Sequence, residues 1–351
     1  MLDTVNNKKI DFEMASEIAS KLMENVSSAI FGQENLIVET LCAFLANGHI
    51  LMTGAPGLAK TTLVRVFAKN LGLQFGRVQF TPDLLPSDIT GSEILNIDPE
   101  SQVRSFEFAS GPIFANLVLA DEINRASPRT QSAMLEAMQE RTVTVAGRMH
   151  RLPKPFMVFA TQNPYESEGT FPLPEAQLDR FLIHSIVEYP SKEAEMKILS
   201  EHAADSLVGE SCFREDEEQR YTIDAQTIDA LLKEVNKIRI DEEVLMGINS
   251  LVRSTRPNDF YCPEDLKSSI WYGAGPRAGL SLISTSRALA LVEGSQYVRW
   301  QHIRRMCRPV LRHRIRLTSQ AMHQQLDEDY LIGTLLQRVE EQHANLAKGI
   351  T

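Results

Sequence analysis

The stretch from His49 to Thr62, HILMTGAPGLAKTT, constrains the fold of this chain more than any other. The apolar residues at its start predict a buried strand, and its glycines and proline predict a tight loop. Apolar residues then recur at helical spacing as far as Gly72, where a helix would stop. Strand, loop and helix in this order are typical of a phosphate-binding loop, where backbone N–H groups and the helix dipole bind an anion. A plain Gly/Pro turn before a lysine is the alternative interpretation.

The phosphate-loop pattern gives the polar residues after the turn distinct roles. Lys60 would reach the β- and γ-phosphates of a nucleotide, and the Thr61 hydroxyl would bind Mg²⁺. Ala59 replaces the glycine of the general pattern, which is tolerable if its backbone is already helical and not at positive φ. The candidate nucleotide-binding residues of the loop are Gly54, Ala55, Pro56, Gly57, Leu58, Ala59, Lys60, Thr61 and Thr62.

Length and composition describe a globular chain of ordinary makeup. Its 351 residues are enough for two domains, and its net charge of −10 argues weakly against wholesale binding of nucleic acid or anionic membranes. The cysteines are scattered without a C-x-x-C pair, which indicates reduced thiols and not a zinc site or a disulfide framework. No signal-like segment and no run of about 18 apolar residues is evident, so we expect a cytoplasmic protein without membrane insertion.

Two later strand ends carry polar residues that suit a phosphate loop. The apolar stretch from Ile113 to Ala120 runs into Asp121, which would hold Mg²⁺ through a water, and Glu122, which is placed to polarise an attacking water. Asn163 follows the next buried strand and could hydrogen-bond the γ-phosphate or that water. Paired acids at a strand end and an Asn-Pro turn are each common. When they follow a phosphate loop in an alternating α/β pattern, they indicate a site that hydrolyses a nucleotide.

Several other segments allow two interpretations. Gly32 interrupts a helical pattern over residues 12 to 48, where it could let the backbone approach an adenine ring or simply form a turn. Hairpins predicted over 88–108 and 142–152 could be working elements or structural inserts. Arg180 lies at a helix–strand junction, and Arg277 lies near a helix start, where the dipole disfavours a cation.

The strand pattern ends near Pro190, so we predict an α/β core over 1–190 and a helical domain over 191–351. In the second part, the segment 299–316 contains seven arginines among apolar residues. It could grip nucleic acid, but we favour an amphipathic helix whose arginines pair with acids of this chain. The acidic segment 210–220 has no chemistry that we can assign.

Taken together, these motifs resemble the MoxR family of AAA+ ATPases over residues 14 to 348. The family's Walker A motif resembles residues 54–61, including the alanine, and its Walker B motif resembles residues 117–125. Residues 160–164 resemble sensor 1, carried by Asn163. Residues 174–181 resemble the arginine-finger segment, carried by Arg180, and residues 275–278 resemble sensor 2, carried by Arg277.

The resemblance implies an α/β fold, an AAA+ P-loop core with a central, mostly parallel sheet flanked by helices. The two hairpins would be the helix-2 insert and the pre-sensor-1 hairpin, and a smaller helical lid would follow. ATP and Mg²⁺ are the implied cofactors, with Thr61 and Asp121 on the metal. The implied catalytic residues are Glu122, Asn163, Lys60, Arg180 and Arg277.

The resemblance also implies an assembly and a kind of partner. Family members form a ring, usually hexameric, with ATP between neighbouring subunits, and act as chaperone-like remodellers, often with von Willebrand factor A-domain proteins. The client, and whether Arg277 serves its own subunit or a neighbour, stay open. A nucleic-acid motor of the related helicase clade and a non-catalytic nucleotide switch are the alternatives.

Overall fold

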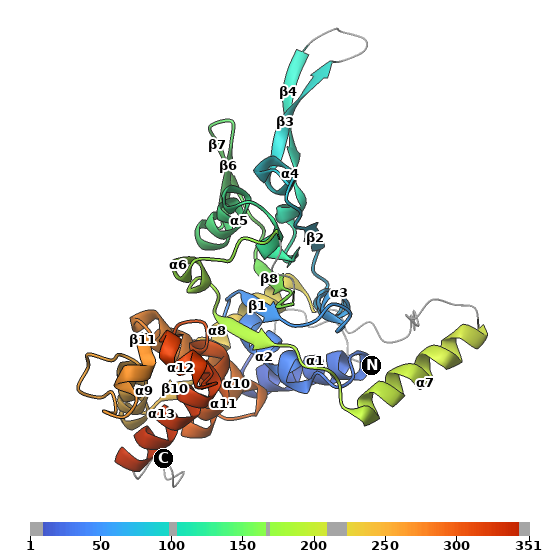
Figure 1. Ribbon diagram of the computed structural model, residues 1–351. Helices are drawn as coiled ribbons and strands as arrows, with labels where there is room; N and C mark the ends of the chain where they lie inside the picture. The colour runs from blue at the N-terminus through green and yellow to red at the C-terminus, as the bar shows by residue number, and fades with distance from the viewer. Residues whose placement is uncertain (1–9, 98–103, 166–168, 209–222, 344–351) are drawn as a thin grey trace.

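The computed structural model describes residues 10–97, 104–165, 169–208 and 223–343. Its centre is a five-stranded sheet with strand order β2-β5-β8-β1-β9 (Figure 1). All neighbouring strands are parallel, so their carboxyl ends meet at one edge, where α/β sheets bind ligands. The strands are β1 (Ile50–Thr53), β2 (Phe75–Gln79), β5 (Leu117–Asp121), β8 (Met157–Gln162) and β9 (Ile183–Ile186).

Three helices cover one face of the sheet. They are α1 (Phe12–Ala29), α2 (Glu34–Leu45) and α3 (Lys60–Leu71). Asp11 caps α1, because its Oδ1 accepts a hydrogen bond from the Met14 backbone N–H at 3.0 Å. The apolar stripe of α1, which includes Leu22 and Val26, is buried on this face.

The opposite face packs against α5 (Pro128–Glu140), with the short helices α4 (Pro86–Thr90), η1 (Pro112–Phe114) and η2 (Ile123–Arg125) beside it. In the sequence, Ser127-Pro128 is typical of an N-cap followed by proline at the first helical position, and helix α5 begins there. The Ser127 side chain caps it by accepting from the Thr130 backbone N–H, and Pro128 fits the first helical position, where no N–H is needed.

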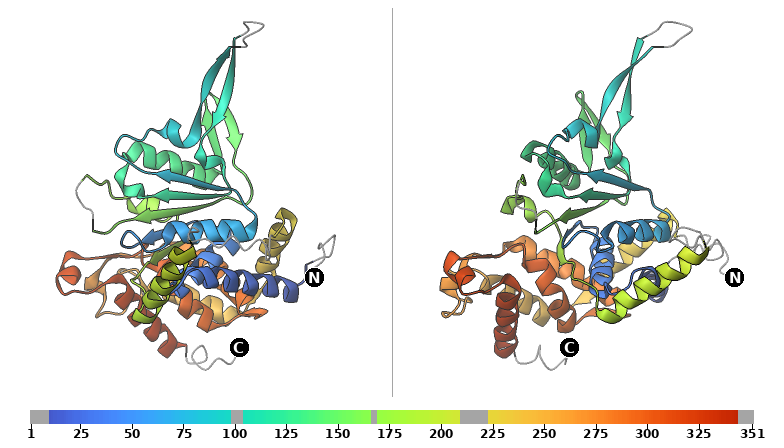
Figure 2. Two further views of the ribbon diagram at one scale, coloured as in Figure 1. Left: turned by 90° about the vertical axis from the view of Figure 1, so that its right-hand side faces the viewer. Right: turned by 45° about the vertical axis from the view of Figure 1, so that its right-hand side comes forward.

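Two β-hairpins extend from this side of the sheet (Figures 1 and 2). They are β3 (Gly91–Ile97) with β4 (Arg104–Ser110), and β6 (Thr142–Val145) with β7 (Arg148–Arg151). The first begins later than predicted because Pro86–Thr90 form α4, where the Asp88 carboxylate accepts the Leu85 N–H at 2.9 Å. The Phe108 and His150 rings stack with centroids 3.9 Å apart, which joins the two hairpins.

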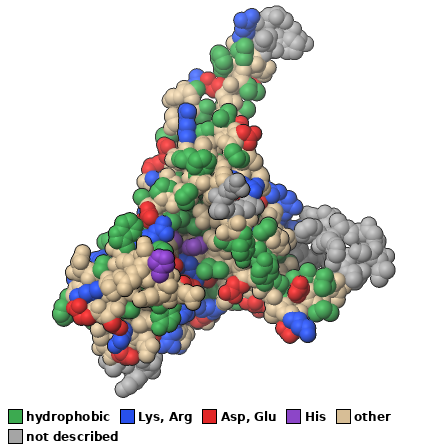
Figure 3. All heavy atoms as spheres, in the orientation of Figure 1, with side chains coloured by type: hydrophobic (Ala, Val, Ile, Leu, Met, Phe, Trp, Pro, Cys, Tyr) green, Lys and Arg blue, Asp and Glu red, His purple; other side chains and the backbone are tan. Residues whose placement is uncertain are grey.

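The chain after β9 is mainly helical. Its first helix, α7 (Lys192–Val208), projects from the body of the molecule and exposes Met196, Ile198 and Leu199 (Figures 1 and 3). The remaining elements form the C-terminal helical part. They are α8 (Ala225–Lys237), β10 (Arg239–Ile240), α9 (Glu242–Ser254), η4 (Lys267–Ser269), β11 (Ile270–Tyr272), α10 (Pro276–Val292), β12 (Tyr297–Val298), α11 (Trp300–Leu311), β13 (Arg316–Leu317), α12 (Ser319–His323) and α13 (Glu328–Gln342). Of these, α8 and α10 contact α1 and α2.

The N-terminal helices and this C-terminal helical part share one hydrophobic cluster. Helix α10 packs on both α1 and α2, and buried side chains from all three belong to the same core as one face of the sheet. The predicted division at residue 190 therefore crosses a continuous core, and the division stays a prediction. Across the described residues, no helix is both apolar and long enough to span a membrane.

Candidate nucleotide-binding site

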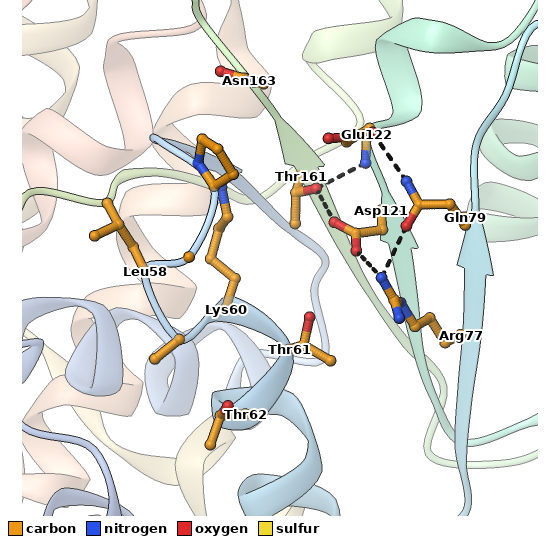
Figure 4. Close-up of a pocket in the computed structure, with 13 residues that line it drawn as sticks. Leu58, Lys60, Thr61, Thr62, Arg77, Gln79, Asp121, Glu122, Thr161 and Asn163 are labelled. Atoms are coloured by element: carbon orange, nitrogen blue, oxygen red, sulfur yellow. Dashed lines mark hydrogen bonds and ion pairs between the residues drawn. The ribbon is translucent and has the colours of Figure 1, made fainter. Parts of the chain in front are cut away.

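A cleft of about 390 Å³ lies at the carboxyl edge of the sheet, beside the loop between β1 and α3 (Figure 4). Four separate segments of the chain meet in it, because the parallel strands end side by side. The lining residues are Pro56, Gly57, Leu58, Ala59, Lys60, Thr61, Thr62, Arg77, Gln79, Asp121, Glu122, Thr161 and Asn163. The structure therefore brings the predicted phosphate loop, both acids and Asn163 together.

The Asp121 carboxylate is hydrogen-bonded through both of its oxygens. Oδ1 accepts from Thr161 Oγ1 at 2.7 Å, and Oδ2 accepts from Arg77 Nη2 at 2.8 Å. Thr161 Oγ1 also accepts the backbone N–H of Glu122 at 2.8 Å. These bonds fix the ends of β5 and β8 against each other, so the orientation of Asp121 is well defined.

The Glu122 carboxylate lies next to Asp121 but has its own partners. Gln79 Nε2 donates to Glu122 Oε2 at 3.0 Å, and Arg125 Nη1 lies 3.0 Å from the same oxygen. The Glu122 backbone is left-handed, with φ of +57°. This conformation is costly for a residue other than glycine, and such strained residues recur at active sites.

Lys60 begins α3, and its ammonium group bends back over its own loop. Nζ donates to the Gly54 carbonyl at 2.6 Å and to the Ala55 carbonyl at 3.1 Å. Burial lowers the pKa of Lys60, while the nearby Asp121 and Glu122 carboxylates raise it and so offset part of that effect. Gly54 and Ala55 themselves are buried beneath the loop and do not line the cleft.

Ala59 does not meet the condition stated above for tolerating an alanine, which is a helical backbone without positive φ. Ala59 has φ of +54° and ψ of +15°, which is left-handed. The physical reason is that α3 begins only at Lys60, so Ala59 is the residue at which the loop turns into the helix. Its methyl group is exposed at the cleft, which leaves space for a side chain at this position.

Gly32 lies outside the cleft. Its backbone has φ of +72°, and a Cβ built on it would lie 2.8 Å from Ala194 Cβ and 2.9 Å from Pro190 Cβ. Glycine is therefore required here by a left-handed turn packed against the start of the C-terminal part. The alternative of a plain helix–helix turn accounts for Gly32, and the predicted approach to an adenine ring has no support from the geometry.

Arg180 and Arg277 also lie outside the cleft, near Asp179. Arg277 Nη1 is 3.3 Å from Asp179 Oδ2, and the buried Arg314 Nε donates to Asp179 Oδ1 at 2.7 Å. Arg180 directly follows Asp179 in the chain and is half-buried. Within the described part of the chain, its guanidinium has no hydrogen-bond or ion-pair partner.

The arginines of segment 299–316 are largely engaged within the chain, as the amphipathic-helix interpretation predicts. Five of them pair with carboxylates of other elements, which leaves few free for a phosphate backbone. The pairs are Arg304 with Glu340, Arg305 with Glu293, Arg312 with Asp329, Arg314 with Asp179 and Arg316 with Glu175. The acidic segment 210–220 lies outside the described residues.

Sequence reasoning missed two polar side chains of the cleft, Arg77 and Gln79 on β2. They alternate with the buried Val78, and the sheet register pairs Gln79 with Asp121. A polar–apolar–polar pattern at the end of the second predicted strand was the signal that could have found them, because strand ends converge at this edge.

The donor set of the cleft fits Mg²⁺. Thr61 and Asp121 supply a hydroxyl and a carboxylate oxygen, the hard donors that this ion prefers, and Mg²⁺ at nucleotide sites needs only one or two protein ligands. Among the described residues, no group of three or more His, Cys, Asp or Glu side chains could hold a metal by itself. This arrangement suits an ion that arrives with phosphates.

Comparisons with known proteins agree with this geometry. The sequence profile of the "ATPase family associated with various cellular activities (AAA)" matches residues 49–183, and that of the "AAA lid domain" matches residues 264–332. The first range contains the cleft residues, and the second lies within the C-terminal helical part.

Individual proteins match over most of their length. The chain is 40% identical to chaperone MoxR1 of Mycobacterium tuberculosis over 90% of this chain and 80% of that protein. It is 38% identical to the uncharacterized protein YeaC of Bacillus subtilis, over 92% and 94% respectively. A crystal structure of a protein from Cytophaga hutchinsonii, described as a proposed ATPase, superposes with a TM-score of 0.82 at 35% identity and covers 93% of this chain and 95% of that one.

Proposed function

The chain belongs to the MoxR family of AAA+ ATPases, and we propose that it couples Mg²⁺-dependent ATP hydrolysis, in a ring of identical subunits, to chaperone-like remodelling of a protein client. Three features of the structure support this proposal. They are the composition of the cleft, the location of Arg180, and the apolar side chains of the hairpins.

In the cleft, each side chain has a role that its position supports. The loop N–H groups and Lys60 would bind and orient the phosphates, and Thr61 and Asp121 would hold Mg²⁺. When bound, the ion neutralises charge on the phosphate oxygens. Glu122 accepts a proton from the attacking water, and Asn163 orients that water or the γ-phosphate. Catalysis of this kind depends mainly on positioning and charge stabilisation.

The observation that carries the ring assembly is the location of Arg180. Its guanidinium lies outside the cleft of its own subunit, without a partner in the described part of the chain, although phosphoryl transfer benefits strongly from a cation on the transferred group. We infer that Arg180 completes the cleft of a neighbouring subunit. Arg277 forms an ion pair with Asp179, the residue that directly precedes Arg180. We therefore assign Arg277 to the same neighbouring cleft.

The hairpins offer a surface for an unfolded or partly unfolded client. Leu95 and Phe106 face each other across β3 and β4, and their side chains are 49% and 66% exposed. Met149 on the second hairpin is 65% exposed. Exposed apolar side chains on projecting hairpins suit contact with a polypeptide. We assign a von Willebrand factor A-domain protein as partner from the family resemblance alone.

The proposal is tested by the specific ATPase activity as a function of protein concentration, with the mass of the assembly measured in the same buffers. We expect activity per subunit to rise with concentration as a ring-sized species forms, and to require Mg²⁺. The Glu122→Gln variant should assemble and bind ATP but lose turnover. Concentration-independent activity from a monomer would contradict the shared site while leaving an ATPase.

A further inference from the structure

Arg77 is a cation of the cleft to which the proposed mechanism gives no task. It lies on β2, the edge strand of the sheet, and the strand alternation directs Arg77 and Gln79 to one face and buries Val78 on the other. Because Gln79 pairs in register with Asp121, the Arg77 guanidinium reaches the carboxylate at the end of the next strand (Figure 4).

The guanidinium connects the two acids of the site. Arg77 Nη2 donates to Asp121 Oδ2 at 2.8 Å and to Gln79 Oε1 at 2.9 Å. The Gln79 amide in turn donates to Glu122, as described above. Thr161 already donates to the other Asp121 oxygen, so Arg77 and a Mg²⁺-bound water would compete mainly for Oδ2.

The strength of this ion pair matters, because a competitor must also be displaceable. The Arg77 side chain is 44% exposed, and the Asp121 side chain is 15% exposed. A partly exposed pair of this kind contributes little net stability, since water and salt screen it. Arg77 competes with a second cation because it donates to Asp121 Oδ2, and a pair this exposed can still give way to Mg²⁺ bound with a nucleotide.

We propose that Arg77 is a positioning residue that competes with Mg²⁺ for Asp121 and thereby limits how strongly Mg²⁺ and nucleotide binding reinforce each other. This inference rests on the proposed role of Asp121 as a ligand of the metal. It concerns how much Mg²⁺ raises the affinity for the nucleotide, and the reverse, and does not concern the hydrolytic step.

The test measures binding and needs no turnover. The dissociation constant of a fluorescent, non-hydrolysable ATP analogue is measured in excess Mg²⁺ and in EDTA at matched ionic strength. The dissociation constant in EDTA divided by that in Mg²⁺ reports the coupling, and a larger ratio means that Mg²⁺ strengthens nucleotide binding more. Loss of one positive charge weakens binding of the free nucleotide more than binding of its less negative Mg²⁺ complex, which changes the same ratio, so a variant that keeps the charge is needed to separate the two effects.

In Arg77→Gln this ratio should be about threefold to fivefold larger than in the wild type, which is the range expected for one partly exposed ion pair. Arg77→Lys should lie between the two, since lysine keeps the charge but lacks the planar fork. The matched control is Arg65→Gln, because the Arg65 guanidinium lies over the Phe75 ring of the same strand, and its ratio should not change.

An unchanged or smaller ratio in Arg77→Gln, with an unchanged melting temperature, would overturn the inference and assign Arg77 to the support of β2 alone. The proposed function fails differently. If the wild type does not bind the analogue, or binds it equally well with and without Mg²⁺, the nucleotide or metal assignment of the cleft is wrong whatever Arg77 does.

Discussion

At the scale of single residues, the cleft contains two left-handed backbone conformations at positions that are not glycine, Ala59 and Glu122. Each costs free energy that the surrounding structure must supply. At Glu122 the turn lies between two hydrogen-bonded segments and directs the carboxylate toward Gln79 and Arg125. At Ala59 the turn precedes α3, so the loop N–H groups and the N-terminus of the helix face the same cleft.

The strain at Ala59 leads to a stability prediction. Ala59→Gly should raise the free energy of unfolding by about 0.5–1 kcal/mol, because glycine adopts positive φ without a Cβ penalty. Chemical denaturation measures the change. Ala68→Gly is the control, since Ala68 is buried inside α3 and glycine should cost about 1 kcal/mol there. Equal losses in both variants would contradict the role of positive φ.

The sequence predicts the cleft residues that belong to a linear motif, because loop, strand and helix fix their positions locally. Lys60, Thr61, Asp121 and Asn163 are in this group, and the structure brings all four to one cleft. Arg77 could not be predicted in the same way. Its partner Asp121 is 44 residues away in the sequence, and only the strand register brings the two side chains together.

At the scale of elements, α2 and β9 are joined by a partly buried carboxyl group, that of Glu39. The Ser185 hydroxyl donates to Glu39 Oε2, while Thr53 and His184 are hydrogen-bonded at 2.8 Å at the end of β1. Burial raises the pKa of Glu39 to about 7, although the Ser185 hydrogen bond and Arg312 lower it. His184 of β9 thus contacts β1, the strand that precedes the phosphate loop, and its carbonyl oxygen accepts a hydrogen bond from Arg312 in the C-terminal helical part.

The raised pKa predicts a pH-dependent difference in stability. Below pH 4.5 the Glu39 carboxyl is protonated in both the folded and unfolded states and costs nothing. As pH rises from 4.5 to about 7, only the unfolded state releases the proton readily, so wild-type stability falls. Glu39→Gln removes this penalty, and its free energy of unfolding should exceed that of the wild type by about 1–3 kcal/mol at pH 8.

The measurement is urea denaturation of both proteins from pH 5 to pH 8, in which the advantage of Glu39→Gln should shrink toward pH 5. Glu34→Gln is the matched control, because Glu34 is an exposed acid in the first turn of the same helix. It should show no pH-dependent gain. An advantage of Glu39→Gln that does not vary with pH would contradict the assignment.

Elements with strong local patterns were predicted well, and those that depend on close packing were not. Ser127 and Pro128 define the start of α5 by capping chemistry alone, and the structure confirms it. The predicted hairpin over 88–108 wrongly includes the last three residues of the short helix Pro86–Thr90, because five residues are too few to show helical periodicity. The shared core of α1, α2 and α10 depends on long-range packing that no local pattern reports.

At the scale of the whole molecule, the proposed ring explains an arrangement that a single subunit does not. The cleft gathers phosphate-binding and metal-binding groups, while Arg180 and Arg277 lie together outside it around Asp179. If neighbouring subunits supply these cations, hydrolysis depends on assembly, because the charge that stabilises the transferred phosphoryl group comes from another chain. Hairpins on every subunit would then act on one client together.

The most direct test of this shared site mixes two inactive variants. We expect Glu122→Gln to lack the group that activates water and Arg180→Ala to lack the cation for its neighbour, so each alone should be nearly inactive while folded and ring-sized. Mixed rings contain interfaces in which an intact Glu122 of one subunit meets an intact Arg180 of the next, and the mixture should regain ATPase activity. A mixture that forms mixed rings but remains as inactive as its components would contradict the account.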